Sequence, residues 1–172
     1  KEVLSADIEE VCVESSGLSL EDYYECRSFA LTMGIFYQDR VMHELYRFLE
    51  NFDIHASDII LALHERRPNF SQGIVDLFAA YDTATSTELW DTKEDLEAYT
   101  KSDRSVIDKY VSGELGNNVL YRHRAIALHH LVDDLHEAAF EVAAESLRNK
   151  DQSMYNLYCD YLSELKLYSS CR

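Results

Sequence analysis

The sequence predicts an all-α protein, an irregular helical bundle built on two long helices at about residues 19–52 and 119–149. Three observations lead to this fold class. Apolar residues recur at steps of three, four and seven through both segments. The 172 residues include only one Pro and five Gly, so helix breakers are rare. A single short stretch, 11–13, resembles a strand, and a strand needs a neighbour to pair with.

The N-terminal segment, residues 1–17, is expected to form a short extended arm or a connector to a neighbouring domain. Residues 18–172 then form one helical domain, a size that can bury about two-thirds of its unfolded surface. The chain begins at Lys1 rather than Met. We therefore expect it to be a segment of a longer protein.

The first long helix has a clear start and an unusual centre. Ser19 stands three residues before Asp22, which approximates a capping box. From Phe29 to Tyr37 the chain has no charge, and its only hydroxyls are those of Thr32 and the terminal Tyr37. A helix with apolar residues on every side is either surrounded by other helices of the chain or covered by a partner molecule. Gly34, in this stretch, is expected to mark close packing or a kink.

Two aromatic residues of this helix lie on a line that is otherwise polar. Phe29 and Phe36 are seven residues apart, with Tyr46 nearby in sequence. If the other helices do not reach them, they form an exposed patch of roughly a few hundred Å², the scale that usually marks an interface. We predict that Phe29, Phe36 and Tyr46 are incompletely covered and serve dimerisation or docking.

Capping residues and breakers delimit the remaining helices. Ser57 or Asp58 opens a short helix that Pro68 stops. The next helix runs to about residue 81, and Thr, Ser and Asp at 82–87 predict a loop. Two short helices are expected from about 92 and from 102, the second closed by Gly113. After the break at 116–118 come the second long helix and a last helix at about 153–168.

Composition excludes several classes of partner. Sixteen Lys and Arg against 32 Asp and Glu give a net charge of −16, which repels nucleic acid and anionic membrane surfaces. No apolar run approaches the length of a membrane span, and no signal peptide is visible. The four Cys lack metal-site spacing. We therefore expect a cytoplasmic protein with reduced thiols.

The second long helix contains the one pattern that suggests a metal site. His129, Asp133 and His136 follow at i, i+4 and i+7 on one helix face, and imidazole with carboxylate suits zinc or non-haem iron. Helical di-iron proteins repeat Glu-x-x-His on two helices, and no such pair is present here. We expect a solvated helix flank without a tightly bound metal, and keep a small metal-dependent helical enzyme as an alternative.

Other catalytic patterns are missing. The sequence has no Gly-rich phosphate loop, no G-x-S-x-G and no Ser or Cys with a visible base. Tyr is abundant, with twelve residues, and Tyr side chains suit either a core or a polar-aromatic pocket. The tyrosines considered for such a pocket are Tyr23, Tyr24, Tyr37, Tyr46 and Tyr81.

One stretch resembles a known family. The segment 18–23, which reads Leu-Ser-Leu-Glu-Asp-Tyr, leads through Arg27-Ser28-Phe29 to the aromatic patch at 35–39. This order resembles the region that follows the catalytic barrel in cobalamin-binding-domain radical SAM proteins, where an S-x-E-D-Y/W helix start precedes R-x-F. Residues 10–16 occupy the place of the family's preceding strand. The resemblance covers about the first 50 residues.

The resemblance implies a parent enzyme that binds cobalamin and a [4Fe–4S] cluster and cleaves S-adenosylmethionine. The family's Cys-x-x-x-Cys-x-x-Cys motif and its cobalamin- and SAM-binding motifs are not found in this chain. No cofactor ligand can therefore be assigned here. The resemblance implies a catalytically silent helical accessory domain that closes the site or recognises substrate or a partner, contacting upstream domains or a second copy. A free-standing helical protein–protein interaction domain is the alternative.

Overall fold

The computed structural model describes residues 8–171, and the all-α fold class is confirmed. Extended pairing in this range is limited to an isolated bridge between Ser15 and Leu18. Residues 8–14 form neither helix nor strand, as expected for an arm. The first seven residues of the expected arm lie outside the described range.

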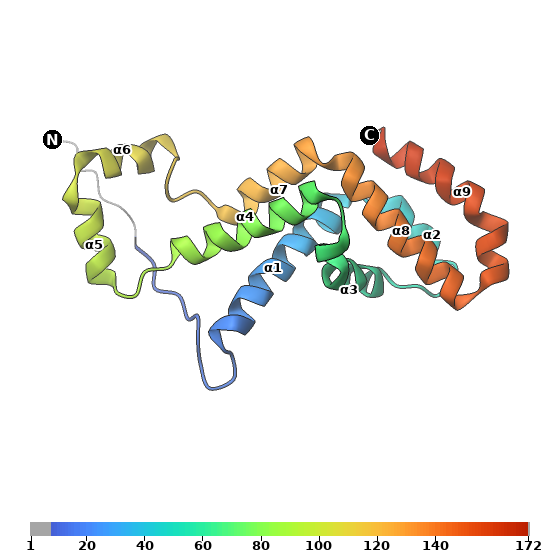
Figure 1. Ribbon diagram of the computed structural model, residues 1–172, viewed down its shortest axis with the longest axis horizontal. Coiled ribbons are helices and arrows are strands. Elements are labelled where there is room, and N and C mark those ends of the chain that lie inside the picture. The colour runs from blue at the N-terminus through green and yellow to red at the C-terminus, as the bar shows by residue number, and fades with distance from the viewer. Residues whose placement is uncertain (1–7, 172) are drawn as a thin grey trace.

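Nine α-helices and two 3-10 turns account for most of the described chain (Figure 1). In order they are α1 (Leu20–Phe36), η1 (Gln38–Arg40), α2 (His43–Glu50), α3 (Ala56–Arg66), η2 (Arg67–Asn69), α4 (Gln72–Glu88), α5 (Lys93–Ser102), α6 (Arg104–Ser112), α7 (Val119–His130), α8 (Val132–Lys150) and α9 (Gln152–Ser170).

The helices form three groups along the length of the molecule. α1 packs against α3, α4 and α7, and α8 forms a hairpin with α9 that also contacts α2 and α3. α5 and α6 pack chiefly on each other, and Figure 1 shows them at the far end from α9. The core runs through the first two groups, where each fully buried Leu or Ile contributes about 1.5–3 kcal/mol. Its fully buried side chains include Leu31, Ile35, Leu45, Leu49, Leu63, Ile74, Leu135 and Leu147.

The expected long helix at 19–52 divides into α1 and α2. Helix α1 ends at Phe36, and Arg40 adopts a φ of 58°, a left-handed conformation that no α-helix can pass through. The Tyr46 hydroxyl donates to the Phe36 carbonyl at 2.8 Å and satisfies a carbonyl at the helix end. The apolar spacing continues into α2 because Met42 and Leu45 still face the core.

The expected long helix at 119–149 also divides, at a single residue. Leu131 has φ −125° and ψ 17° between α7 and α8. Its side chain packs on α4 at Gly73, where an added Cβ would lie 2.7 Å from Leu131 Cδ2. The close approach of the two helices at this glycine accompanies the break.

The predicted loop at 82–87 is wrong, because α4 continues to Glu88. Tyr81 and Thr85 are buried on its inner face. Thr83 and Thr87 on the outer face donate their hydroxyls to the carbonyls of the residues four earlier, at 2.8 and 2.7 Å. Packing thus overrides the weak helix propensity of this Thr- and Ser-rich segment.

Several local predictions are confirmed. Ser19 and Asp22 form the full capping box of α1. Gly113 ends α6 with a φ of 77°, and the break at 116–118 separates α6 from α7. Gly34 marks close packing, since an added Cβ would lie 3.3 Å from the Arg124 side chain on α7.

The expected exposed patch does not form as predicted. Phe36 is 1% exposed and Tyr46 is 6% exposed, both covered by the chain's own residues. Phe29 is half-buried, with its ring edge-on to His64 at a centroid distance of 5.0 Å. The prediction of incomplete coverage is therefore wrong for Phe36 and Tyr46, because both side chains belong to the hydrophobic core, where the Tyr46 hydroxyl binds the Phe36 carbonyl.

This burial predicts the effect of truncating Phe36. Phe36→Ala should lower the free energy of unfolding by about 3–5 kcal/mol, since it leaves a cavity in the core. Tyr37→Ala removes a neighbouring ring that is 51% exposed, and should cost less than about 1 kcal/mol. Urea unfolding followed by circular dichroism measures both. Similar losses in the two variants would contradict the core position of Phe36.

Candidate functional site

The structure does not bring the predicted metal triplet together as a site. His129 is exposed near the end of α7, and Asp133 is exposed in the first turn of α8 beyond the break. His136 is 2% exposed, and its Nδ1 donates to the Val132 carbonyl at 2.7 Å. Among residues 8–171, no group of three or more His, Cys, Asp or Glu is arranged to hold a metal ion.

The tyrosines considered for one polar-aromatic pocket occupy separate places. Tyr23 and Tyr24 pair edge-on at the start of α1, and Tyr37 lies against Tyr46 beyond its other end, about 20 Å away at 1.5 Å rise per residue. Tyr81 is buried on α4, edge-on to His123 of α7. These side chains do not share a pocket.

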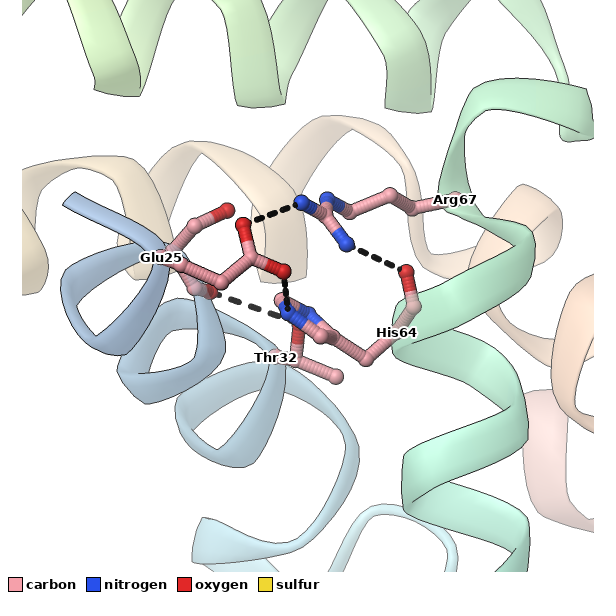
Figure 2. A network of polar contacts seen from close by, with 5 residues as sticks. Glu25, Thr32, His64 and Arg67 are labelled. Carbon is pink, nitrogen blue, oxygen red and sulfur yellow. Dashed lines mark hydrogen bonds and ion pairs between the residues drawn. The ribbon is translucent and has the colours of Figure 1, made fainter. Parts of the chain in front are cut away.

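A polar network that runs from exposed Glu25 to buried Thr32 and His64 connects α1 with α3 and η2 (Figure 2). His64 Nε2 lies 2.9 Å from Glu25 Oε1, and His64 Nδ1 lies 2.8 Å from the Thr32 hydroxyl. Arg67 donates to Glu25 Oε2 at 2.8 Å and to the His64 carbonyl at 2.7 Å. Both carboxylate oxygens of Glu25 and both ring nitrogens of His64 therefore have partners.

The partners of His64 fix the tautomer of its neutral form. A carboxylate only accepts hydrogen bonds, so Nε2 carries the proton donated to Glu25, and Nδ1 accepts from the Thr32 hydroxyl. Burial and the positive charge of Arg67 lower the pKa of His64, although Glu25 opposes them. His64 is thus held neutral at pH 7.

The negative charge of the network resides on Glu25. Burial would raise the pKa of Glu25, but the hydrogen bond from His64 and the charge of Arg67 outweigh burial and lower it. Helices α1 and α3 are therefore joined through one anion, one cation and one neutral imidazole. Sequence reasoning missed this network, because its members are up to 42 residues apart and form no local motif.

A cleft opens beside this network, between the first half of α1 and the second half of α4. Its volume is about 310 Å³. The residues that line it all carry polar groups and three of them are acidic, although most of the accessible lining surface is formed by their apolar atoms. Burial raises the pKa of Asp82 at this cleft, although the charge of Arg67 opposes the effect. The lining residues are Glu21, Tyr24, Glu25, Ser28, Asp82 and Ser86.

The contact between α1 and α4 contains buried polar atoms without a hydrogen-bond partner. Ser28 Oγ and Arg27 Nε on α1 belong to this set. Buried polar atoms usually have a partner. Arg27 also forms an ion pair with Glu88 at 3.7 Å. The contact between α1 and α4 is therefore polar here and does not extend the apolar core.

A second hollow lies between α2 and α9. This α2–α9 groove has a volume of about 600 Å³ and is lined by Glu44, Arg47, Phe48, Asn51, Tyr161, Glu164, Leu165 and Tyr168. Beside it, α9 exposes large apolar side chains to solvent. Those on one line of the helix are Met154, Leu157, Tyr161 and Tyr168, here called the α9 face.

The lowered pKa of His64 predicts how stability depends on pH. The unfolded chain protonates His64 near its ordinary pKa of 6.5, whereas the folded protein resists protonation until lower pH. The contribution of His64 to the free energy of unfolding is therefore complete above pH 6.5 and is lost as the pH falls below it. Urea unfolding between pH 5 and 7.5, at about half-unit steps, measures the slope.

His64→Gln should flatten this slope, since Gln retains hydrogen-bonding capacity and does not titrate. The matched control is His43→Gln, which removes an exposed imidazole outside the network. Equal flattening in both variants would contradict the assignment to His64.

Comparison with known proteins adds no template for these features. No family model, curated protein or solved structure matches the chain. Within residues 8–171, no helix has the length and apolar character needed to cross a membrane. The α1–α4 cleft, the polar network and the α2–α9 groove are therefore interpreted from their own chemistry.

Proposed function

We propose that the chain is a helical docking domain that binds an amphipathic helix of a partner in the α2–α9 groove. The observation that carries this proposal is the exposed apolar α9 face, which borders the groove. Seating an amphipathic helix between two helices is a common mode of peptide recognition.

The α9 face extends along one side of the helix, with Glu164 between Tyr161 and Tyr168. Its residues follow at steps of three, four and seven, so they lie on one line, about 21 Å long at 1.5 Å per residue. Leu157 is 69% exposed, and Tyr161 and Tyr168 are each about half exposed. Several large apolar side chains exposed on one side of a helix are typical of interaction sites.

The groove supplies anchoring positions for a partner. Phe48 forms its inner wall, with its ring 5.1 Å from that of Tyr161. Leu165 is 9% exposed at its base. Charged side chains of both signs, Glu44, Arg47 and Glu164, also line the groove. An apolar centre with a polar rim is the usual anatomy of an interface.

Charge favours a partner other than a second copy. Each copy has a net charge of −16, so two copies repel at long range. A helix with an apolar face and cationic flanks would instead be attracted to the acidic surface during encounter. The proposed occupant is therefore such a helix, supplied by another domain or protein.

We propose further that the partner is an upstream domain of a cobalamin-dependent radical SAM enzyme, with this chain as its catalytically silent accessory domain. Support comes from the resemblance at residues 18–39, part of which has structural roles here. Ser19 and Asp22 cap α1, and Arg27 pairs with Glu88. In this proposal cobalamin, the cluster and SAM are held by upstream domains in the cytoplasm. A free-standing interaction domain is the alternative, and no observation favours a metal-dependent enzyme.

Binding of a cationic amphipathic helix tests the docking site. The probe is a fluorescein-labelled peptide with leucine and lysine at helical spacing, followed by fluorescence anisotropy. Leu157→Asp and Tyr161→Asp should each weaken binding at least about tenfold, the loss expected for an interface anchor. Both variants add negative charge, so simple charge attraction predicts tighter binding instead.

The matched control is Val111→Asp, which adds the same charge at a 68% exposed position on α6. It should bind the peptide as well as the unmodified chain does. Equal binding by all variants would refute docking on α9. Sedimentation showing a dimer that Leu157→Asp dissociates would identify a second copy as the occupant and contradict the proposed partner.

The identity of the parent is tested separately. The coding sequence upstream of Lys1 should encode the Cys-x-x-x-Cys-x-x-Cys motif, and the longer product should contain iron and cobalamin after anaerobic purification. A longer product with neither the motif nor iron would overturn the radical SAM assignment. The docking proposal would still stand on the peptide measurements.

A further inference from the structure

We propose that the α1–α4 cleft is a binding site for a primary alkylammonium group, of the kind carried by a lysine side chain or a small aliphatic amine. The cleft is distinct from the α2–α9 groove, since the two share no lining residue. The inference therefore does not depend on the docking proposal.

The cleft concentrates negative charge from two helices. Glu21 and Glu25 enter from α1, and Asp82 enters from α4. Arg67 and His64 each bind one oxygen of Glu25, and His64 is neutral in this arrangement. Arg67 is thus the cation that hydrogen-bonds within this group, where it binds Glu25 and acts on Asp82, and three carboxylates line the cleft. A further positive charge would be stabilised here.

Ser28 supplies an independent indication of a ligand. It lines the cleft and is 3% exposed, yet its Oγ is buried without a hydrogen-bond partner. A hydroxyl oxygen can accept a hydrogen bond from an N–H donor. An ammonium group that reaches Ser28 would satisfy this oxygen while its other N–H groups donate to the carboxylates.

The arrangement suits an ammonium group better than a metal ion. A metal needs several ligands converging within about 2.0–2.6 Å of one point, and no group of three such ligands is arranged in this way among residues 8–171. An ammonium group has three N–H donors, which reach acceptors at about 2.7–2.9 Å in different directions.

Tyr24 gives the site a place for the alkyl chain. Its half-buried ring lines the cleft, and its edge-on contact with Tyr23 at 5.8 Å supports its orientation. An aromatic ring beside an ammonium group packs against its methylene stem and attracts the charge to the ring face. The geometry therefore matches both parts of an alkylammonium ligand.

Titration of the full 172-residue chain with n-butylamine at pH 7, followed by amide NMR, tests the site. We expect shifts centred on residues 21–28 and 82–86, and no comparable shifts with n-butanol, which lacks the charge. Asp82→Asn and Ser28→Ala should each raise the dissociation constant at least about threefold, because each removes an acceptor.

Two controls separate binding from general effects. Asp76→Asn removes a carboxylate from an exposed position on the same helix and should leave the dissociation constant unchanged. Ser28→Ala should retain or raise stability, since it removes an unpartnered buried hydroxyl. Loss of affinity in that variant therefore cannot come from unfolding.

The outcomes decide the proposal and the source of the ligand. Tighter binding of Nα-acetyl-lysine methylamide than of n-butylamine would assign the site to a lysine side chain, and the reverse order to a free amine. Equal effects of Asp82→Asn and Asp76→Asn would overturn the proposal by showing diffuse charge attraction. Unchanged affinity in Ser28→Ala, or equal shifts with n-butanol, would also overturn it.

Discussion

Burial of the apolar middle of α1 is the constraint on which the rest of the structure depends. This segment has almost no polar face, so other helices must cover most of its surface; Phe29, Ala30 and Met33 are the partly buried positions. Helices α3, α4 and α7 together surround it. The exception is Thr32, a fully buried hydroxyl, and its hydrogen bond to His64 explains why the polar network extends inward from the surface at this point.

The sequence predicted the features that depend on neighbouring residues. The Ser19–Asp22 cap and the terminus at Gly113 are local in origin. Apolar spacing indicated the inward faces of α4 and α8 but was wrong for α9, where residues at core spacing (Met154, Leu157, Tyr161 and Tyr168) are exposed. The two helix breaks depend on tertiary structure instead. Arg40 takes a left-handed conformation and Leu131 packs on Gly73, some 58 residues earlier in the chain. Neither position contains Gly or Pro, so the sequence had no helix-breaking residue to indicate either break.

The candidate sites were less predictable than the fold for the same reason. Glu25, His64 and Arg67 meet only because α1 and α3 pack together. Periodicity placed His129, Asp133 and His136 on one face because it assumed a continuous helix, and the break at Leu131 invalidates that assumption. The α9 face is exposed because α8 and α2 leave the outer side of α9 uncovered. The spacing of apolar residues alone does not determine which side of a helix its neighbours cover.

Helices α5 and α6 are separated from the other helices, and this affects how the sequence of the domain can change during evolution. The pair is joined to the bundle at the end of α4 and the start of α7, and its helices pack chiefly on each other. If the α5–α6 pair moved away from the bundle, little of the surface that packs against α1 would become exposed to solvent. The hairpin can therefore vary in length or sequence between related proteins without altering the bundle, as an appendage whose evolution is largely uncoupled from that of the core.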